Sequence, residues 1–261
     1  MLVALASLNQ RWEDKSANFV SCENLIQKAK AHMAELIIFP EMTLTGFSMN
    51  IKETAEEIDN SYTVKAFREL SKRFNIGVIF GVVFRQHEKA TNNSIFMGNA
   101  GEFLANYKKI HPFSLSGENE YFEAGEEILF VDFGLLRIGL TICYDLRFPE
   151  IYSALGVKSE LIVNIANWPA KRIDHWITLL KARAIENQIY VAGVNRIGID
   201  NNGLEYMKSS MIYNPNGEIM LPVYSEEQLD IYDINSEMAL KFRSEFSTTQ
   251  DRKPNFYKSI L

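Results

Sequence analysis

The sequence predicts an α/β fold in which helices cover both faces of layered β-sheet. Two continuous apolar segments, LIIF at residues 36–39 and LIVNIA at residues 161–166, are typical of strands buried on both faces. Segments with the three- and four-residue apolar spacing of helices alternate with such strands along the chain. A single central sheet and two stacked sheets both fit this alternation.

The first half of the chain begins with a short β-prone run and then alternates regularly. Residues 16–34 repeat apolar side chains at helical spacing, and residues 61–74 form a second expected helix. The strand expected over residues 35–40 stops at Pro40, which cannot donate a backbone hydrogen bond. The other strands expected here cover residues 3–8, 76–84, 93–99 and 102–108.

The second half repeats this rhythm. Helices are expected over residues 149–155, ending at Gly156, and over residues 174–188, with Asp174 as the N-cap. A turn is expected at Asn214–Pro215–Asn216–Gly217. The expected strands cover residues 128–133, 136–143, 160–168, 190–198, 209–213 and 231–234.

The chain shows no repeat or linker that would divide it, so we expect a single domain over residues 1–261. Residues 241–261 are polar and aromatic, and we expect an irregular, extended tail there. With 27 basic and 33 acidic residues, the net charge of −6 disfavours nucleic acid as a partner, because phosphate binding needs a basic face.

The expected location is the cytoplasm. No apolar run approaches the roughly 20 residues of a membrane span, and the N-terminus lacks the basic segment of a signal peptide. Cys22 and Cys143 lie far apart in the sequence, which favours free thiols in a reducing compartment. The four histidines are scattered without metal-ligand spacing, so we expect no metal site.

Cys143 is the candidate nucleophile. It ends the apolar strand LRIGLTIC and is followed by YDLRFP and a helix, and a strand-to-helix turn projects such a residue out of a sheet. Backbone N–H groups after the turn would face an oxyanion. The alternative is that Cys143 is a small buried apolar residue, which is the interpretation we give to Cys22 on its helix.

Three charged residues are candidates to act with this thiol. Glu41 follows a buried strand, where a carboxylate often faces a site and could serve as a general base, or could simply face solvent. Lys109, or the adjacent Lys108, would lower the pKa of the thiol and neutralise an oxyanion. Glu118 lies in the acidic segment GENEYFEAG, which is otherwise typical of a solvated loop.

Together these segments resemble the nitrilase superfamily of carbon–nitrogen hydrolases, which carries a Glu–Lys–Cys triad in three separate motifs. The motifs here are FPEMTLTGF with Glu41, YKKIHPF with Lys109 and TICYDLRFPE with Cys143, at spacings of 68 and 34 residues. The family lysine stands two residues before the histidine, which selects Lys109 over Lys108. Glu118 matches a further family glutamate that precedes a Tyr–Phe–x–x–Gly segment.

This resemblance implies a four-layer α-β-β-α sandwich, no cofactor, and a homodimer. It implies that Glu41 deprotonates Cys143, that the thiolate attacks an amide carbonyl, and that a thioester forms and is hydrolysed. Lys109 and the backbone N–H of Tyr144 would hold the oxyanion, and Glu118 would orient Lys109 or the substrate.

The segments ANWPAKRIDHW and LLKARAIENQIYVAGVNRIG resemble the omega-amidase branch, whose substrates are short ω-amides of 2-oxo acids such as 2-oxoglutaramate and 2-oxosuccinamate. The candidate substrate contacts lie just after strand ends: Arg147, Phe148, Asn167 and Trp168. The alternative for them is a structural role, since Arg147 could pair with Asp145 and Trp168 could belong to the core. The alternatives are another amidase of the superfamily, such as one for deaminated glutathione, and a catalytically inactive scaffold. A nitrile hydrolase is disfavoured because Tyr144, not tryptophan, follows the cysteine.

Overall fold

The strand β1 (Leu2–Ala6) is buried on both faces and thereby divides two apolar layers in the computed structural model, which describes residues 1–260. Ala4 and Ala6 pack into one apolar cluster, whereas Val3 and Leu5 pack into another. Because side chains alternate across a strand, a strand between two cores must be apolar at every position. The continuous apolar segments in the sequence therefore mark the strands at the centre of the fold.

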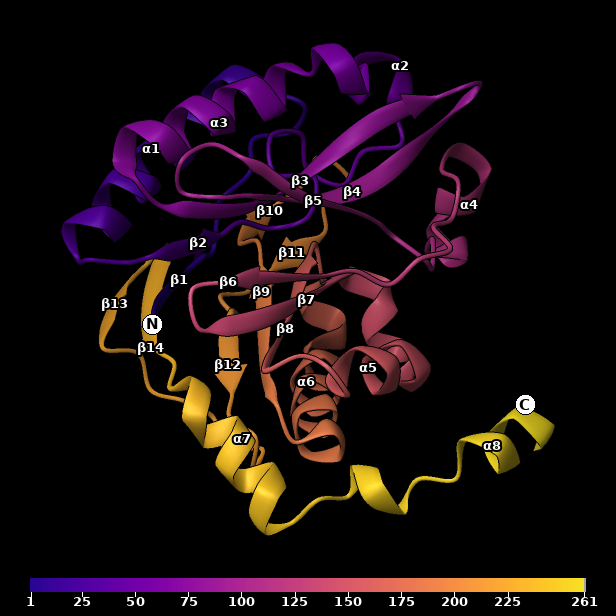
Figure 1. Cartoon of the computed structure of the whole chain (residues 1–261). Helices are drawn as coiled ribbons and strands as arrows, with labels where there is room; N and C mark the ends of the chain where they lie inside the picture. The colour runs from indigo at the N-terminus through magenta and orange to yellow at the C-terminus, as the bar shows by residue number, and fades with distance from the viewer. Residues whose placement is uncertain (261) are drawn as a thin grey trace.

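Two stacked sheets form the middle of the molecule (Figure 1). The strands β1, β2 (Leu36–Ile38) and β3 (Gly77–Gln86) run parallel to one another, as do β7 (Leu136–Ile142), β8 (Leu161–Ala166) and β9 (Tyr190–Asn195). The remaining pairs within the two sheets are antiparallel. The first sheet has the order β13 (Tyr224–Glu226), β14 (Leu229–Asp233), β1, β2 (Leu36–Ile38), β3 (Gly77–Gln86), β4 (Lys89–Met97) and β5 (Phe103–Lys108). The second has the order β12 (Met211–Tyr213), β9 (Tyr190–Asn195), β8 (Leu161–Ala166), β7 (Leu136–Ile142) and β6 (Phe130–Phe133).

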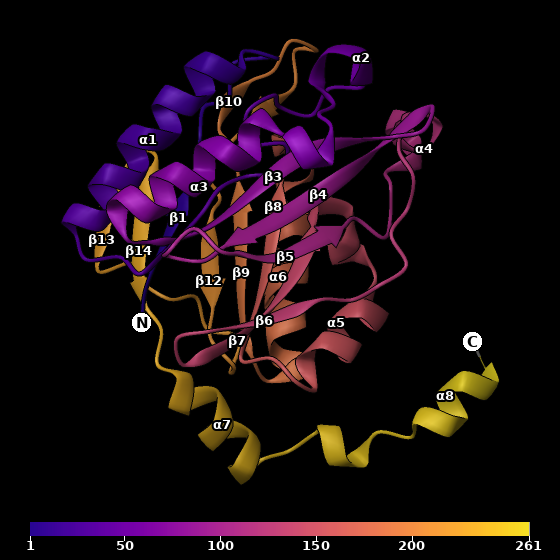
Figure 2. The same ribbon diagram turned by 45° about the horizontal axis from the view of Figure 1, so that its top comes forward.

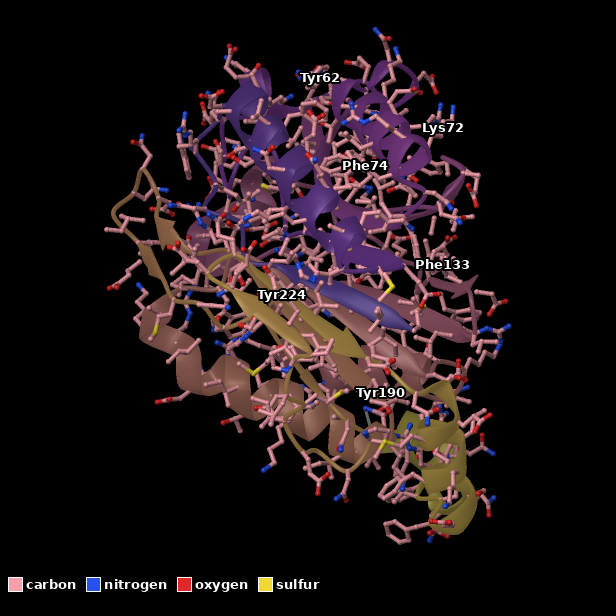
Figure 3. The ribbon with its side chains drawn as sticks, turned by 90° about the vertical axis from the view of Figure 1, so that its left-hand side faces the viewer. Tyr62, Lys72, Phe74, Phe133, Tyr190 and Tyr224 are labelled. Atoms are coloured by element: carbon pink, nitrogen blue, oxygen red, sulfur yellow. The ribbon has the colours of Figure 1, made fainter. Side chains whose placement is uncertain are left out.

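Helices cover the outer face of each sheet (Figures 1 and 2). The helices α1 (Lys15–Ala31) and α3 (Tyr62–Phe74) lie on the seven-stranded sheet, and α5 (Pro149–Gly156) and α6 (Ile173–Asn187) lie on the five-stranded one. Figure 3 shows Tyr62, Lys72 and Phe74 along α3 in this outer layer. The layer order is therefore α-β-β-α, which confirms the expected sandwich and selects two stacked sheets over one.

Shorter elements connect these layers. A two-stranded ribbon consists of β10 (Gly198–Ile199) and β11 (Glu205–Tyr206), and two short helices are α2 (Ile51–Thr54) and α4 (Glu118–Tyr121). The 3₁₀ segments are η1 (Ile58–Asn60), η2 (Ser114–Ser116), η3 (Cys143–Arg147), η4 (Ala170–Arg172) and η5 (Thr249–Asp251).

The C-terminal segment corrects the sequence prediction. Residues 241–245 end α7 (Ser236–Glu245) and residues 254–260 form α8 (Pro254–Ile260), so the expectation of an irregular segment was wrong there. The side chain of Asn235 accepts a hydrogen bond from the N–H of Glu237, a helix-start signal that the polar composition obscured. Figures 1 and 2 show the segment running along one end of the sandwich, where the N–H of Thr248 donates to Gln188 and Arg252 donates to Asn187 at the end of α6. Tyr190, labelled in Figure 3, ties its start to β9 by donating to the carbonyl of Asn235 over 3.1 Å.

The N-cap expected at Asp174 was also wrong. The helix α6 begins at Ile173, with Arg172 at the N-cap, and Asp174 lies in its first turn. A carboxylate in the first turn still favours the helix because it faces the positive end of the helix dipole.

No helix within residues 1–260 is long and apolar enough to cross a membrane.

Candidate active site

The candidate residues follow the ends of parallel strands at the centre of the two sheets. Glu41 comes shortly after β2, Cys143 directly after β7 and Asn167 directly after β8. The stacking of the two sheets brings these strand ends together. A hydrogen bond shows this proximity, since the backbone N–H of Asn167 donates to Oε2 of Glu41 over 2.9 Å. The carboxyl ends of parallel strands are where open α/β sheets bind their ligands.

Lys109 joins two buried carboxylates. Its Nζ atom lies 3.0 Å from Oε1 of Glu41 and 2.8 Å from Oε2 of Glu118. All three side chains are buried, at 1% or less of their surface exposed. Lys108, in contrast, points to the surface and pairs with Glu123 at 3.6 Å. The structure therefore brings Lys109, and not Lys108, to Glu41, and it places Glu118 against the same ammonium.

Asn92 completes this cluster and was not found from the sequence. Its Nδ2 atom donates to Oε1 of Glu41 over 2.7 Å and to Oε1 of Glu118 over 3.0 Å. Asn92 lies on the buried strand β4 within the segment ATNNSIF, where no motif distinguishes it from Asn93. Only the pairing of β4 with its neighbours shows that one of these two asparagines faces the carboxylates.

Close backbone approach holds the Glu41 segment against β3. A Cβ atom on Gly81 would lie 2.2 Å from the backbone nitrogen of Met42, far inside van der Waals contact. The N–H of Gly81 donates to Oγ1 of Thr43 over 2.8 Å, and its carbonyl accepts from the N–H of Thr43 over 3.0 Å. Met42 itself has a φ of 46°, an uncommon conformation for a residue with a side chain. Glycine at 81 thus permits the turn that aims Glu41 into the site.

Cys143 lies at a sharp elbow between β7 and η3, as the sequence predicted. Its φ of 45° is a left-handed conformation, which often marks a functional position when a residue has a side chain. Asp145 fixes the elbow by accepting from the N–H of Ile142 over 3.0 Å and from the hydroxyl of Tyr107 over 2.8 Å. The same carboxylate accepts from the N–H of His111 over 3.0 Å, so it joins the elbow to the segment that carries Lys109.

Electrostatics at the thiol differ from the sequence expectation. Burial raises the pKa of Cys143, the negative charge of Glu41 raises this pKa further, and Lys109 lowers it. Lys109 thus acts in the expected direction, but burial and Glu41 outweigh it and the net change in the pKa of the thiol is upward. Burial alone would lower the pKa of Lys109, but Glu118 and Glu41 outweigh burial and raise it, so the lysine remains charged.

A small pocket opens beside the thiol. The volume within which the centre of a water molecule fits is about 70 Å³. A single water molecule needs roughly 10–15 Å³ by the same measure. The pocket therefore suits a small molecule rather than a polypeptide. Its walls include Cys143, Tyr144, Arg147, Asn167, Trp168 and Arg172.

The structure brings three of the four expected substrate contacts to this pocket. Arg147, Asn167 and Trp168 line it, and Tyr144, expected for its backbone N–H, does so as well. Phe148 does not line the pocket. Its ring stacks on His111, with the centroids 3.6 Å apart and the planes 9° from parallel, so it packs behind the wall.

Two further observations concern the arginines. The expected alternative of an Arg147–Asp145 ion pair was wrong, because Asp145 binds Tyr107, His111 and Ile142 instead. Arg172 was not singled out from the sequence, although it lies in the quoted segment ANWPAKRIDHW. Its position in η4, just after the strand that ends at Ala166, is the signal that was available.

Residues 1–260 contain two free cysteines, Cys143 and the fully buried Cys22. Burial raises the pKa of Cys22, and its place in the core leaves it no role at the pocket. Within the same residues no group of three or more His, Cys, Asp or Glu side chains is placed to hold a metal ion.

The chain matches known proteins over most of its length. A model of the carbon-nitrogen hydrolase family matches residues 2–243. The omega-amidase YafV of Yersinia enterocolitica is 36% identical to this chain over 242 residues, covering 92% of each. The 2-oxoglutaramate amidase of Bacillus subtilis is 30% identical over 245 residues, covering 93% of each.

Solved structures agree with the fold. XC1258 from Xanthomonas campestris, a CN-hydrolase superfamily protein with an arsenic adduct in its active site, superimposes with a TM-score of 0.89. It is 30% identical to this chain, and the match covers 97% of both. An amidase from Nesterenkonia shares the fold with a TM-score of 0.87 at 23% identity, covering 100% of this chain and 96% of its own.

Proposed function

The chain belongs to the carbon–nitrogen hydrolase family, and on this premise we propose that it is an omega-amidase that hydrolyses short ω-amides of 2-oxo acids, such as 2-oxoglutaramate. The observation that carries the proposal is the meeting of Glu41, Glu118 and Lys109 close enough to Cys143 for the charges of all three to act on its thiol. This set of groups suits nucleophilic hydrolysis of an amide, and the names of the relatives indicate the substrate class.

Attack on the amide begins with a proton transfer from Cys143 to Glu41. Oε1 of Glu41 already accepts from Lys109 and Asn92, whereas Oε2 accepts only the N–H of Asn167. That N–H also lowers the pKa of the Cys143 thiol through a hydrogen bond, so it lies close to the sulfur. Oε2 is therefore the oxygen with a free lone pair on the side of the thiol, and it takes the proton as the sulfur attacks the carbonyl carbon.

Lys109 stabilises the tetrahedral intermediate. Two of its contacts go to one carboxylate, at 3.0 Å and 2.8 Å from the oxygens of Glu118. One of the three N–H groups of Lys109 can therefore turn from these contacts and donate a hydrogen bond to the oxyanion. The ion pair between Lys109 and Glu118 stays intact. The backbone N–H of Tyr144 supplies the second donor, and such donors in a site shielded from water strongly favour the transition state.

The intermediate collapses to a thioester as the C–N bond breaks. Glu41 returns its proton to the leaving nitrogen, which departs as ammonia. A water molecule then enters, Glu41 accepts its proton, and the hydroxide attacks the thioester carbonyl. Expulsion of the Cys143 thiolate and its reprotonation by Glu41 release the carboxylic acid and regenerate the enzyme.

Ammonia release from a panel of amides tests this function. The panel contains 2-oxoglutaramate, 2-oxosuccinamate, glutamine, deaminated glutathione and a simple nitrile, each with wild type and Cys143→Ala. We expect turnover of the two 2-oxo amides by wild type alone. Activity confined to deaminated glutathione would keep the chemistry but contradict the substrate, and silence on every compound would contradict the proposed function.

We also infer a homodimer. Several apolar side chains of α6 and the C-terminal segment are exposed in the single chain, among them Ile177, Ile185, Phe246 and Phe256. Light scattering during size-exclusion chromatography tests this inference, and a mass near 29.9 kDa at micromolar concentration would contradict it. The cytoplasmic location expected from the sequence stays a prediction.

A further inference from the structure

Two guanidinium groups line the same pocket as the nucleophile. Arg147 belongs to η3, which begins at Cys143 itself, and Arg172 ends η4, which follows β8. The chemical steps proposed above use neither of them. Because a guanidinium group stays protonated in proteins, two positive charges lie beside the thiol, and a negatively charged partner would be attracted there.

Neither guanidinium finds that partner within the part of the chain that the structure describes. Ion pairs there involve four other arginines, Arg73, Arg85, Arg137 and Arg183, and none involves Arg147 or Arg172. The side-chain hydrogen-bond contact of Arg147 is with a ring nitrogen and not with a carboxylate, since its Nη2 lies 3.2 Å from Nδ1 of His175. Arg183, on the adjacent helix, shows the contrast, because it pairs with Glu186 and donates to the carbonyl of Leu146.

Aromatic rings hold both guanidinium groups in place. The Cζ atom of Arg147 lies 4.9 Å from the ring centre of Trp168, and that of Arg172 lies 5.3 Å from the ring centre of Phe113. Phe113 in turn packs on Tyr144, with ring centroids 4.7 Å apart, and Arg147 lies 5.9 Å from the Tyr144 ring. The two arginines therefore flank one aromatic cluster. The faces of its rings attract the guanidinium groups and leave the guanidinium N–H groups free to donate to a ligand.

The backbone beneath Arg172 is fixed. The indole Nε1 of Trp168 donates to the carbonyl of Arg172 over 2.8 Å, and the N–H of Trp168 donates to Oδ1 of Asn195 over 2.8 Å. An anchored backbone and a stacked guanidinium lose little freedom on binding a ligand, which is the preorganisation that a recognition group needs.

We propose that Arg147 and Arg172 together bind the carboxylate at the end of the substrate remote from the scissile amide, and that Arg172 is a specificity-determining residue. Guanidinium groups match a carboxylate with paired, charge-assisted hydrogen bonds. This inference rests on the proposed amidase function and deepens it by assigning the group that selects anionic amides.

The charge balance of the pocket supports this assignment. Glu41, Glu118 and Lys109, when all are ionised, leave an excess of one negative charge next to the thiol. A second negative charge on the substrate would be repelled there, because charges interact strongly where water is excluded. The two arginines offset both charges, so the pocket accepts an anionic amide that the catalytic cluster alone would reject.

Selectivity between a charged and a neutral amide tests the proposal. We would measure kcat/KM for 2-oxoglutaramate and for 4-oxopentanamide, in which a methyl group replaces only the carboxylate, in wild type, Arg172→Gln, Arg172→Lys and Lys171→Gln. Lys171 is the matched control because it is the exposed cationic neighbour. We expect Arg172→Gln to lower the ratio of the two kcat/KM values about 10- to 100-fold, mainly through KM, as for lost hydrogen bonds to a charged group.

The expected pattern further includes partial recovery in Arg172→Lys and an unchanged ratio in Lys171→Gln. An unchanged ratio in Arg172→Gln, or an equal fall in Lys171→Gln, would overturn the proposal. The thermal midpoint of each variant, measured by circular dichroism, separates these results from misfolding.

A binding measurement keeps this test separate from that of the function. The dicarboxylate 2-oxoglutarate should protect Cys143 of wild type from alkylation by iodoacetamide, whereas the neutral 4-oxopentanamide at the same concentration should not. Arg172→Gln should lose the protection. If wild type releases no ammonia from 2-oxoglutaramate, the proposed function fails, but protection by 2-oxoglutarate still decides whether the arginines bind a carboxylate, and its absence in wild type would overturn the proposal.

Discussion

The side-chain amide of Asn92 donates a hydrogen bond of 2.7 Å to Oε1 of Glu41. The same nitrogen lies 3.0 Å from Oε1 of Glu118, so one buried amide spans two carboxylates that share a lysine. This contact and that of Lys109 occupy Oε1, so Oε2 of Glu41, which accepts the N–H of Asn167, is the oxygen left to take the proton of the thiol in the proposed mechanism. Asn92 is thus a positioning residue, which acts on the reaction through the orientation of the base.

Replacing Asn92 by leucine should lower kcat about 10- to 100-fold, because hydrogen bonds to charged groups contribute roughly 1.5–3 kcal/mol. KM should change much less, since Asn92 does not line the pocket. The matched control is Asn93→Leu, because Asn93 donates to Oδ1 of Asn106 and not to the carboxylates. Steady-state kinetics decide the matter, and a larger loss in Asn93→Leu would show that β4 packing, not Glu41, explains the effect.

The two adjacent lysines should behave differently. Lys109→Ala removes the cation between Glu41 and Glu118 and leaves two buried carboxylates unpaired, so activity should disappear and stability should fall by about 3–5 kcal/mol. Lys108→Ala removes only a surface pair and should stay within about twofold of wild-type activity. Ammonia release and urea unfolding measure both effects. Normal turnover in Lys109→Ala would mean that the oxyanion is held by other groups.

Gly81 should tolerate no side chain. In Gly81→Ala the new Cβ would collide with the backbone of Met42 and Glu41, and the collision cannot be relieved by rotating a side chain. We expect a displaced Glu41 and a loss of kcat of at least about 100-fold, since a shift near 1 Å at a catalytic group has effects of that size. Gly203→Ala is the control for general destabilisation, because its φ of 75° strains the backbone while its Cβ would meet no atom within 4 Å. A fully active Gly81→Ala enzyme would contradict the positioning of Glu41 by β3.

Alkylation of Cys143 should depend on pH in a way that reports its raised pKa. Because burial and the charge of Glu41 outweigh Lys109, half-maximal alkylation should lie above the roughly 8.5 of a free cysteine. Glu41→Gln removes a negative charge that raises this pKa, so the midpoint should move to lower pH in that variant. Iodoacetamide rates from pH 6 to 10, followed by peptide mass spectrometry to distinguish Cys22, give both midpoints. A wild-type midpoint well below 8.5 would instead indicate a resting thiolate paired with Lys109.

The sequence predicted the layers and the triad because both leave local signals. Continuous apolar strands revealed the double burial of β2 and β8, and each triad residue stands at the end of a strand within its own motif. The N-cap of α6 was misplaced at Asp174 because the actual N-cap, Arg172, makes no side-chain capping hydrogen bond and so carries no capping signal in the sequence.

Other residues left little or no local signal. Asn92 reaches the site through strand pairing, which only the tertiary structure defines, and the only sequence signal for Arg172 was its position soon after a strand. Phe148 follows the nucleophile closely in sequence, yet the turn of η3 directs its ring onto His111 and away from the pocket. The net effect on the Cys143 thiol was likewise hidden, because it depends on how burial and three neighbouring charges combine.

The most direct test of the account is the mass of the enzyme during turnover. Wild type mixed with 2-oxoglutaramate and quenched in acid should carry an added acyl group, equal to the substrate less ammonia, on the peptide that contains Cys143. Cys143→Ala should form no adduct and release no ammonia, while its circular dichroism spectrum stays that of wild type. Continued ammonia release by Cys143→Ala, or an acyl group on a different residue, would contradict nucleophilic catalysis by Cys143.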